Sequence, residues 1–228
     1  MATDTDRGVI VRHDDFDELA LDTTNVGYST NADAGGTAFA INEQRNGVIR
    51  GSVDTTDNDI TNIFGVPLYR ADAGGPLKLE VRAALITSIA DGETYIGWTD
   101  DDGTDENPLT LSTADVLTSN ATDGCGFMYT GGGTANWKVA GVKNGSDTAV
   151  VACDDFGATT PVAATFQTFT IILDAAGNAE FFINGHWQAS VANAVTATTL
   201  LSFGAAIQSG GTARSLDIDY VRYEVGRA

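Results

Sequence analysis

The sequence predicts a nearly all-β protein, a jelly-roll sandwich of two antiparallel sheets. Short apolar runs recur from end to end between polar or glycine-containing breaks, and the chain holds 26 glycines. Several runs alternate apolar and polar residues with the period of two that a half-buried strand requires. Because such sandwiches reach about 200 to 250 residues as one unit, the 228 residues predict one domain over 9–228, after a flexible segment over 1–8.

The two ends of this domain carry matching strands. The segments GVIVRHDDF at 8–16 and SLDIDYVRYEV at 215–225 have similar length and alternation, so we expect them to pair in one sheet. Between them, PLKLEVRAAL at 76–85 gives the clearest period-two pattern, with one apolar face for the core and one charged face for water. The residues that alternate are Leu77, Leu79, Val81, Ala83 and Leu85 with Lys78, Glu80 and Arg82.

A three-strand meander is expected farther along the chain. TFTIILDAAGNAEFFING predicts a strand around 169–173, a turn at 174–178 and a second strand around 180–183. The pair Asn184-Gly185 supplies the positive φ angles that a tight turn needs. HWQASV then predicts a third strand, which carries Trp187.

The remaining segments are expected to be loops or short turns. Only DDFDELAL at 14–21 and STADVL at 112–117 have a helical pattern, and both are short. The glycine-rich pieces GTAF at 36–39, ADAGGP at 71–76 and YTGGGTANW at 129–137 are expected to connect strands. None of them matches a phosphate-binding loop or a dinucleotide fingerprint.

The charge argues against nucleic acid as a partner. The chain has 31 acidic and 12 basic residues, a formal net charge of -19, and this surface would repel a phosphate backbone. The longest apolar run falls short of the roughly 18 residues that a membrane span needs. The start MATDTDRGVIVRHDD has neither the basic nor the apolar region of a signal peptide, so we expect no membrane contact and no export by the general secretory route.

The two cysteines, Cys125 and Cys153, are expected to be half-buried thiols. If 124–130, 136–143 and 148–153 form a meander, the first and third strands run in the same direction, and the two cysteines lie at opposite ends of them. A disulfide needs Cα atoms within about 7 Å of each other. The spacing therefore argues against a disulfide.

The order of the segments resembles a known family. A DDF start is followed by PLKLEVRAAL, YIGWTDDDG, DGCGFMYTGGGTANWKVAGVKNG, TFTIILDAAGNAEFFINGHW and SLDIDYVRYEV. This succession, over roughly residues 14–225, resembles the concanavalin-A-like lectin/glucanase domains of tailed-phage and prophage virion proteins. The hairpin DxxGNAEFFINGxW and the closing LDIDYV are patterns of a sandwich rather than of an active site. The resemblance implies a capsid decoration or cement role, or a place in a tail fibre, by analogy of fold.

The sequence does not predict an enzyme. The glucanase branch of this superfamily has Glu-x-Asp-x-x-Glu on one strand, and none of the seven glutamates begins that motif. The only histidines, His13 and His186, lie in no recognisable nucleophile or metal arrangement. We therefore expect no catalytic residue and no cofactor, and a hydrolase or lyase that uses an unfamiliar site is the remaining enzymatic alternative.

An acidic loop is the candidate metal site. TDDDGTDEN at 99–107 gathers five carboxylates in seven positions, and calcium favours such oxygen-rich loops. The candidate ligands are Asp100, Asp102 and Asp105. The EF-hand spacing is absent, and acidic loops are ordinary in an acidic protein, so a solvated loop is the alternative.

Tryptophans are the candidate sugar platforms. An aromatic ring stacks on a sugar face while Asp or Asn side chains bind the hydroxyls. Trp137 and Trp187 are the candidate glycan contacts, and Trp98 lies in the strand-like run YIGW. The alternative for each tryptophan is a place in the core.

The lack of a catalytic motif predicts a non-enzymatic protein, and the resemblance implies that it is a virion structural protein. We expect a capsid decoration or cement protein on the phage head surface, assembled in the host cytoplasm. Its partners would be the major capsid protein lattice and further copies of itself, in a dimer or trimer. The alternative is a carbohydrate-binding, lectin-like module on a tail fibre.

Overall fold

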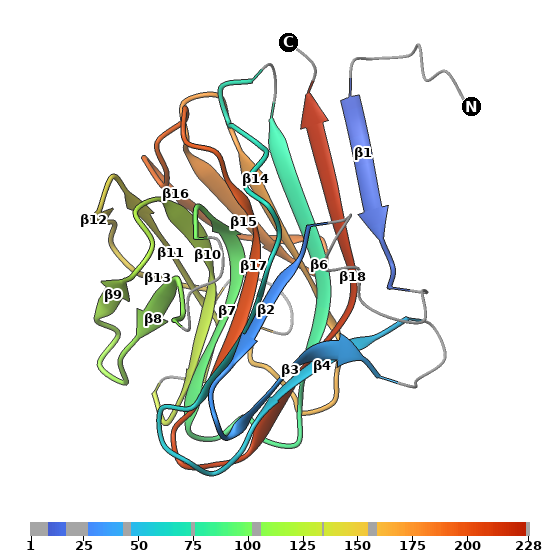
Figure 1. Cartoon of the computed structure of the whole chain (residues 1–228). Coiled ribbons are helices and arrows are strands. Elements are labelled where there is room, and N and C mark those ends of the chain that lie inside the picture. Colours follow the sequence, from blue (N-terminus) through green and yellow to red (C-terminus); the bar gives the residue numbers. More distant parts are fainter. Residues whose placement is uncertain are drawn as a thin grey trace.

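A computed structural model describes residues 9–16, 27–42, 47–73, 76–101, 106–133, 135–154 and 159–226. Within them the chain forms two antiparallel sheets packed face to face (Figure 1). The predicted all-β sandwich is confirmed. No helix among these residues is long and apolar enough to cross a membrane.

The first sheet, sheet A, holds both ends of the described chain. Its central strand is β18, which pairs with β6 on one side and with β4 and β1 on the other. The strands of sheet A are β1 (Val9–Asp14), β3 (Gly36–Ile41), β4 (Ile49–Val53), β6 (Leu77–Ile86), β14 (Gln167–Leu173), β15 (Ala179–Ile183), β16 (His186–Val191) and β18 (Arg214–Gly226). The register of β1 on β18 runs from Val9 opposite Gly226 to Asp14 opposite Val221, which confirms the predicted pairing of the first and last strands.

The second sheet, sheet B, is built around β7, which lies between β10 and β17. Its strands are β2 (Ser29–Ala32), β5 (Ile60–Phe64), β7 (Gly92–Thr99), β10 (Gly124–Gly131), β11 (Lys138–Lys143), β12 (Ser146–Asp147), β13 (Val151–Ala152) and β17 (Ser202–Ser209). A small separate hairpin consists of β8 (Leu109–Leu111) and β9 (Leu117–Ser119).

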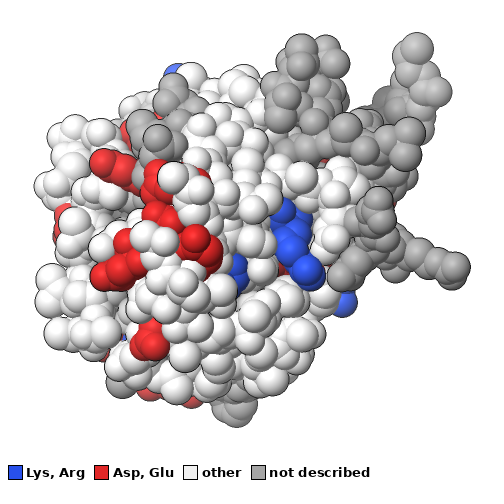
Figure 2. Space-filling model, turned by 60° about the horizontal axis from the view of Figure 1, so that its bottom comes forward, with Lys and Arg blue, Asp and Glu red and all other residues white. Residues whose placement is uncertain are grey.

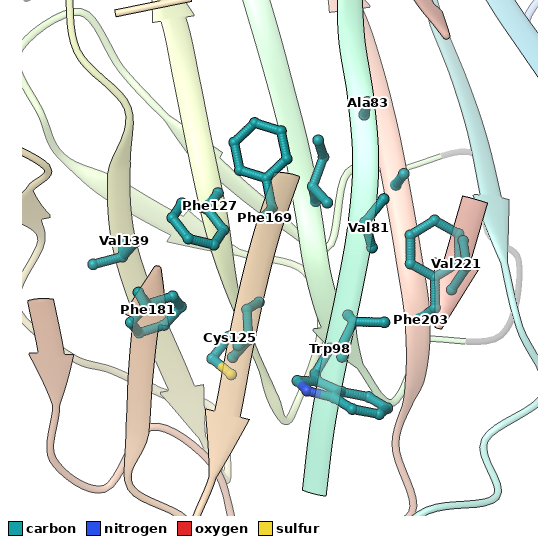
Figure 3. Packing of buried hydrophobic residues seen from close by; sticks show 14 of the residues in the cluster. Val81, Ala83, Trp98, Cys125, Phe127, Val139, Phe169, Phe181, Phe203 and Val221 are labelled. Carbon is teal, nitrogen blue, oxygen red and sulfur yellow. The ribbon is translucent and has the colours of Figure 1, made fainter. Parts of the chain in front are cut away.

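The core lies between the two sheets and is rich in aromatic rings. The ring of Phe127 on β10 lies 5.1 Å from that of Phe169 on β14 and 5.3 Å from that of Phe181 on β15 (Figure 3). The inward residues of β6 are fully buried, and its outward residues are half-buried except for Ala84, which is buried; this is close to the predicted period-two pattern. Burying one such aromatic side chain contributes about 2 to 3 kcal/mol.

Both cysteines are free thiols, as predicted, but they are fully buried rather than half-buried. Burial raises the pKa of the Cys125 thiol far above its usual range and that of the Cys153 thiol to about 12. Because the thiolate is the reactive form, neither cysteine is a candidate nucleophile.

Two predictions of loops need correction. The piece GTAF is not a loop, because its residues belong to β3, and Tyr129 to Gly131 belong to β10. Residues 112–116, whose helical pattern is too short for a helix, make the tip of the β8–β9 hairpin. Residues 17–21 of the other helical window, and the segment 1–8, lie outside the described residues.

Candidate functional site

Glycines lie at the centre of the outer face of sheet B. Ile96 and Trp98 of β7 point into the core, so Gly97 between them points outward. Gly97 lies opposite Gly126 of β10 on one side and Gly204 of β17 on the other, which makes a row of three glycines across the central strands. Outward positions on central strands are where a catalytic or binding side chain would be expected, and glycine provides no side chain.

The ring of Tyr95 occupies the space above Gly97 and Gly126, while Phe64 and Thr99 lie above Gly204. The Tyr95 hydroxyl donates a hydrogen bond of 2.6 Å to the Trp98 carbonyl oxygen. A Cβ atom on Gly126 would lie 2.6 Å from Cε2 of Tyr95, so the glycine is needed where the ring lies against the sheet.

The β8–β9 hairpin covers Tyr95 and its surroundings. Leu109 and Leu111 of β8 are buried in a second, smaller apolar cluster outside the sandwich. The residues of sheet B in this cluster are Tyr95, Met128, Ala140, Val142 and Ala206. At the tip of the hairpin, the Asp115 carboxylate forms an ion pair of 2.5 Å with Lys138 Nζ of β11, and Lys138 is 3% exposed. The hairpin therefore covers part of the outer face of sheet B.

One carboxyl points outward from the central strands of sheet B at the edge of this cover. Glu93 of β7 lies in a hollow of about 230 Å³ that is also lined by Asp57, Asp91, Thr130 and Gln208. Its carboxylate accepts a hydrogen bond from the Leu111 backbone N–H of the hairpin. Ligand pockets usually measure about 300 to 1,000 Å³, so this hollow is small for a sugar substrate.

The environment of Glu93 perturbs its ionisation. Burial raises the pKa of Glu93, while the Leu111 hydrogen bond and the nearby Arg214 act in the opposite direction. Arg214 is itself 1% exposed, and burial lowers its pKa to about 10. A carboxyl with a raised pKa among other carboxylates is what a hydrolase would use as its acid. Since Glu93 is bonded to the hairpin in a hollow this small, we interpret it as an anchor for the hairpin.

Replacing Glu93 with glutamine tests this interpretation through the pH dependence of stability. When folding raises the pKa of a carboxyl, the free energy of unfolding falls as the pH rises above the pKa in the unfolded state, which is about 4.3 for glutamate. The Glu93→Gln variant keeps the acceptor for Leu111 and removes this cost. We expect the free energy of unfolding in urea to rise by about 1 kcal/mol at pH 8 and by less at pH 5. A loss of stability at both pH values would show that attraction to Arg214 outweighs the cost of burial.

The predicted calcium loop is only partly described. Asp102 and Asp105 lie outside the described residues. The Asp100 carboxylate accepts hydrogen bonds from the backbone N–H groups of Thr122 and Asp123, at 3.2 and 3.1 Å. Among the described residues, no three His, Cys, Asp or Glu side chains are placed to hold a metal ion.

The two candidate glycan tryptophans have different positions. Trp137 is 2% exposed, its indole N–H donates to Gln167 Oε1 at 2.9 Å, and its ring packs 4.8 Å from Phe169. The suggestion that Trp137 contacts a glycan is therefore wrong for this fold, because its ring belongs to the core. Trp98 is buried as well, whereas Trp187 is 44% exposed.

Trp187 lies on the outer face of sheet A, which is open. The strand registers place six outward residues in one row across the sheet: His13, Arg222, Glu80, Thr170, Phe182 and Trp187. Phe182 lies directly opposite Trp187, so two aromatic side chains adjoin at one end of the row. Sequence reasoning found Trp187 but missed Phe182, although the alternation in AEFFI could have assigned one of its phenylalanines to the outer face.

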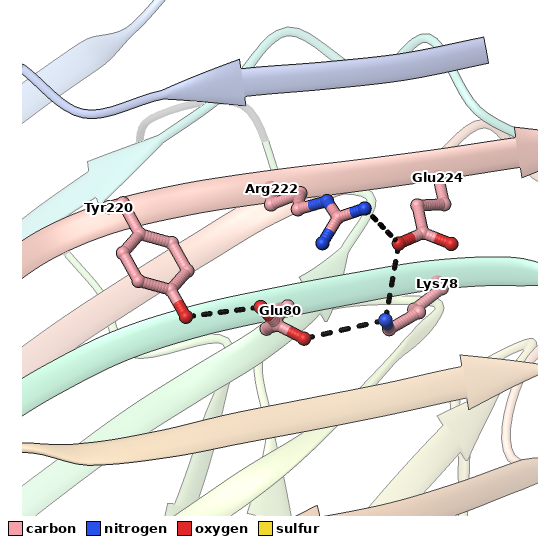
Figure 4. A network of polar contacts seen from close by, with 5 residues as sticks. All are labelled: Lys78, Glu80, Tyr220, Arg222 and Glu224. Carbon is pink, nitrogen blue, oxygen red and sulfur yellow. Dashed lines mark hydrogen bonds and ion pairs between the residues drawn. The ribbon is translucent and has the colours of Figure 1, made fainter. Parts of the chain in front are cut away.

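The charged residues of this face neutralise one another. Lys78 Nζ lies 3.4 Å from Glu80 and 3.2 Å from Glu224, and Arg222 lies 2.8 Å from Glu224 (Figure 4). The Tyr220 hydroxyl donates a hydrogen bond of 3.0 Å to Glu80. Such exposed pairs contribute about 0 to 1 kcal/mol each, but they leave no free cation in this network.

A larger hollow adjoins the aromatic pair on the same sheet. It measures about 480 Å³ and lies where β14, β15 and β16 meet the 174–178 turn. Its lining residues are Pro76, Ile172, Asp174, Asn178, Ala179, Glu180, Ser190, Val191 and Ala192. This volume is within the range of ligand pockets.

Carboxylates gather at the end of the molecule that lies at the bottom of Figure 1. The loops between β2 and β3, β4 and β5, and β6 and β7 carry Asp33, Asp54, Asp57, Asp59 and Asp91. Figure 2, which brings this end forward, shows acidic side chains clustered on it. Burial raises the pKa of Asp59, and the nearby negative charges of Asp54 and Asp33 raise it further. This acidic end would repel another copy of itself.

Comparisons with known proteins agree with this architecture. No protein-family model matches the sequence, and no curated protein matches it. Among solved structures, an endo-acting O-glycanase of the human gut microbiota is similar over 95% of this chain and 99% of its own, with a TM-score of 0.64 and 13% identity.

Two further structures give the same result. A Bacillus licheniformis β-glucanase is similar over 93% of this chain and 97% of its own, with a TM-score of 0.62 and 11% identity. The carbohydrate recognition domain of Emp47p is similar over 90% of both chains, with a TM-score of 0.58 and 11% identity. The chain therefore has the concanavalin-A-like lectin/glucanase fold, which is shared by enzymes and binding domains alike.

Proposed function

We propose that the chain is a non-enzymatic virion structural protein, of the decoration type that its sequence resembles. The observation that supports a non-enzymatic role is the outer face of sheet B. Glycosidases of this fold place two carboxyls on one face, whereas the central strands here present the row Gly126, Gly97 and Gly204, and only Glu93 at the edge. The hairpin over Tyr95 further reduces the space for a substrate.

The test of this role is the copy number of the protein in purified particles. Quantitative mass spectrometry should give a ratio to the major capsid protein near one or a simple fraction such as one-third, as expected for a protein bound across the head lattice. A handful of copies would indicate a fibre, and absence from particles would contradict the virion role. Turnover of any polysaccharide by the purified protein would contradict the non-enzymatic part.

We further propose that the protein forms a dimer or trimer away from its acidic end. A chain with a net charge of -19 repels its copies, and this repulsion weakens as salt shortens the Debye length from about 8 Å toward about 3 Å. Light scattering coupled to size exclusion should show the oligomer fraction rising from low to high salt. A monomer at every salt concentration would contradict the proposal.

The second candidate function is that of a carbohydrate-binding module, for example on a fibre. The exposed Trp187, opposite Phe182 on the neighbouring strand, favours it, because aromatic side chains at a surface are suited to stacking on sugars. The similar structures include a carbohydrate recognition domain, which is consistent with this use of the fold. Binding to any glycan in a screen of polysaccharides would support this candidate.

A further inference from the structure

The outer face of sheet A combines an aromatic platform with a polar hollow. Phe182 and Glu180 are two residues apart on β15, so both point outward and lie about 7 Å apart along the strand. Across from them on β16, Trp187 lies opposite Phe182 and Ser190 lies opposite Glu180. The rings and the hollow are therefore parts of one continuous surface.

The rim of the hollow is fixed by its own hydrogen bonds. Asp174 accepts from the backbone N–H groups of Ala176 and Asn178, both at 2.9 Å, and from the Asn178 side chain at 2.7 Å. Asn178 in turn accepts a bond of 2.9 Å from the Asn193 backbone N–H. These groups are occupied, and they hold the turn in place before any ligand arrives.

Two polar groups inside the hollow remain free. Among the described residues, neither the Glu180 carboxylate nor the Ser190 hydroxyl has a hydrogen-bond partner or an ion pair, and both line the hollow. A carboxylate accepts hydrogen bonds from hydroxyl groups, and serine both accepts and donates. Ile172 and Pro76 supply an apolar floor next to them.

The charges of this surface indicate the class of ligand. The nearest cation along the sheet is Lys78, opposite Ile172, and it is held by Glu80 and Glu224. The charged residues that line the hollow are Glu180 and Asp174, both negative, in a protein with a net charge of -19. An anionic sugar would thus be repelled, whereas an uncharged one would supply the hydroxyl donors that Glu180 lacks.

We propose that Trp187, Phe182, Glu180 and Ser190 form a binding site for an uncharged glycan. The ligand is an oligosaccharide of two or more units, with one ring on the aromatic pair and the next in the hollow. This inference rests on the carbohydrate-binding candidate function and adds its location and ligand class. It places the site on the sheet opposite to the one that the hairpin covers.

Affinity electrophoresis through gels that contain polysaccharide tests the proposal. The neutral probes are dextran, mannan, galactan and mixed-linkage β-glucan, and the anionic probes are alginate and polygalacturonate. We expect the wild type to be retarded by at least one neutral probe and by neither anionic one. Trp187→Ala and Glu180→Ala should each weaken that retardation on the order of tenfold, which corresponds to about 1.4 kcal/mol.

The control is Val116→Ala, which removes an exposed apolar side chain from the hairpin on the other sheet and should leave retardation unchanged. Unaltered melting temperatures would show that all variants are folded. Equal retardation of all variants would overturn the location but not the glycan-binding function. Retardation by anionic probes would overturn the ligand class, and no retardation of the wild type by any probe would overturn the function and the site together.

Discussion

Replacing Gly97 with alanine should lower the free energy of unfolding by about 3 kcal/mol or more. A Cβ atom at this position would lie 2.2 Å from the Cys125 carbonyl oxygen and 2.6 Å from the Gly126 Cα atom. Both atoms belong to the backbone of β10, which is held in register with β7 over eight residues, so they cannot move aside without breaking hydrogen bonds. Overpacking in a core costs about 1 to 3 kcal/mol where side chains can adjust. Here the clashing atoms belong to the backbone, so we expect a loss at or above the upper end of that range. Urea denaturation measures the effect.

The matched control for this variant is Gly145→Ala. Gly145 has a φ of +71°, and a Cβ atom there would meet no neighbouring atom within 4 Å, so only backbone strain opposes the substitution. That strain costs about 1 to 2 kcal/mol. A Gly97→Ala loss no greater than the control loss would mean that the strands can separate at the glycine row. The face could then accept side chains, and the structural argument against a catalytic site there would fail.

The fold was predictable because its signals are local. The alternation in 76–85 identified β6, and the Asn184-Gly185 turn identified the β15–β16 hairpin, since both depend on neighbours in the sequence. The pairing of β1 with β18 followed from the similar patterns of two distant segments. These elements bury their apolar residues on one face, which is what a period of two encodes.

The arrangement on the outer faces was not predictable, because it depends on contacts between distant segments. Leu109 and Leu111 are two leucines on either side of a threonine in the sequence, and only the fold brings them onto Tyr95 and Met128. Trp137 and Trp187 look alike in the sequence, yet one fills the core and the other is exposed. The glycines of YIGW and DGCGF gave no sign of aligning in one row across three strands.

The ion pair between Asp115 and Lys138 should decide whether the hairpin stays closed. Lys138 Nζ is buried, and its charge is balanced by the Asp115 carboxylate at 2.5 Å. Asp115 has a φ of +62°, a conformation that asparagine tolerates, so Asp115→Asn removes the charge without adding backbone strain. Breaking a fully buried pair costs about 3 to 5 kcal/mol. Because the Asp115 side chain is 38% exposed and water can reach it, we expect about 2 kcal/mol.

Hydrogen exchange shows where this loss is felt. Amide protection over β8 and β9 should fall in Asp115→Asn while that of β6 and β18 stays unchanged, because the hairpin packs outside the main core. Asp147→Asn, at an exposed position on the edge of sheet B, should change stability by less than about 0.5 kcal/mol. Adding Lys138→Met to Asp115→Asn should restore stability, since an apolar side chain of similar length needs no partner there.

An opened hairpin also tests the proposed role. Opening would uncover Tyr95 and the glycine row. It would also release Glu93, the one outward carboxyl on the described central strands, from its hydrogen bond to Leu111. Asp57 and Asp91 line the same hollow as Glu93, but both lie in loops at its edge. Glycoside hydrolysis needs an acid and a base or nucleophile on either side of the scissile bond, and the central strands would present only Glu93 to a bound chain. We therefore expect Asp115→Asn to hydrolyse no polysaccharide. Activity that appears in Asp115→Asn and disappears in the double variant with Glu93→Gln would instead identify the hairpin as a cover over an active site that includes Glu93.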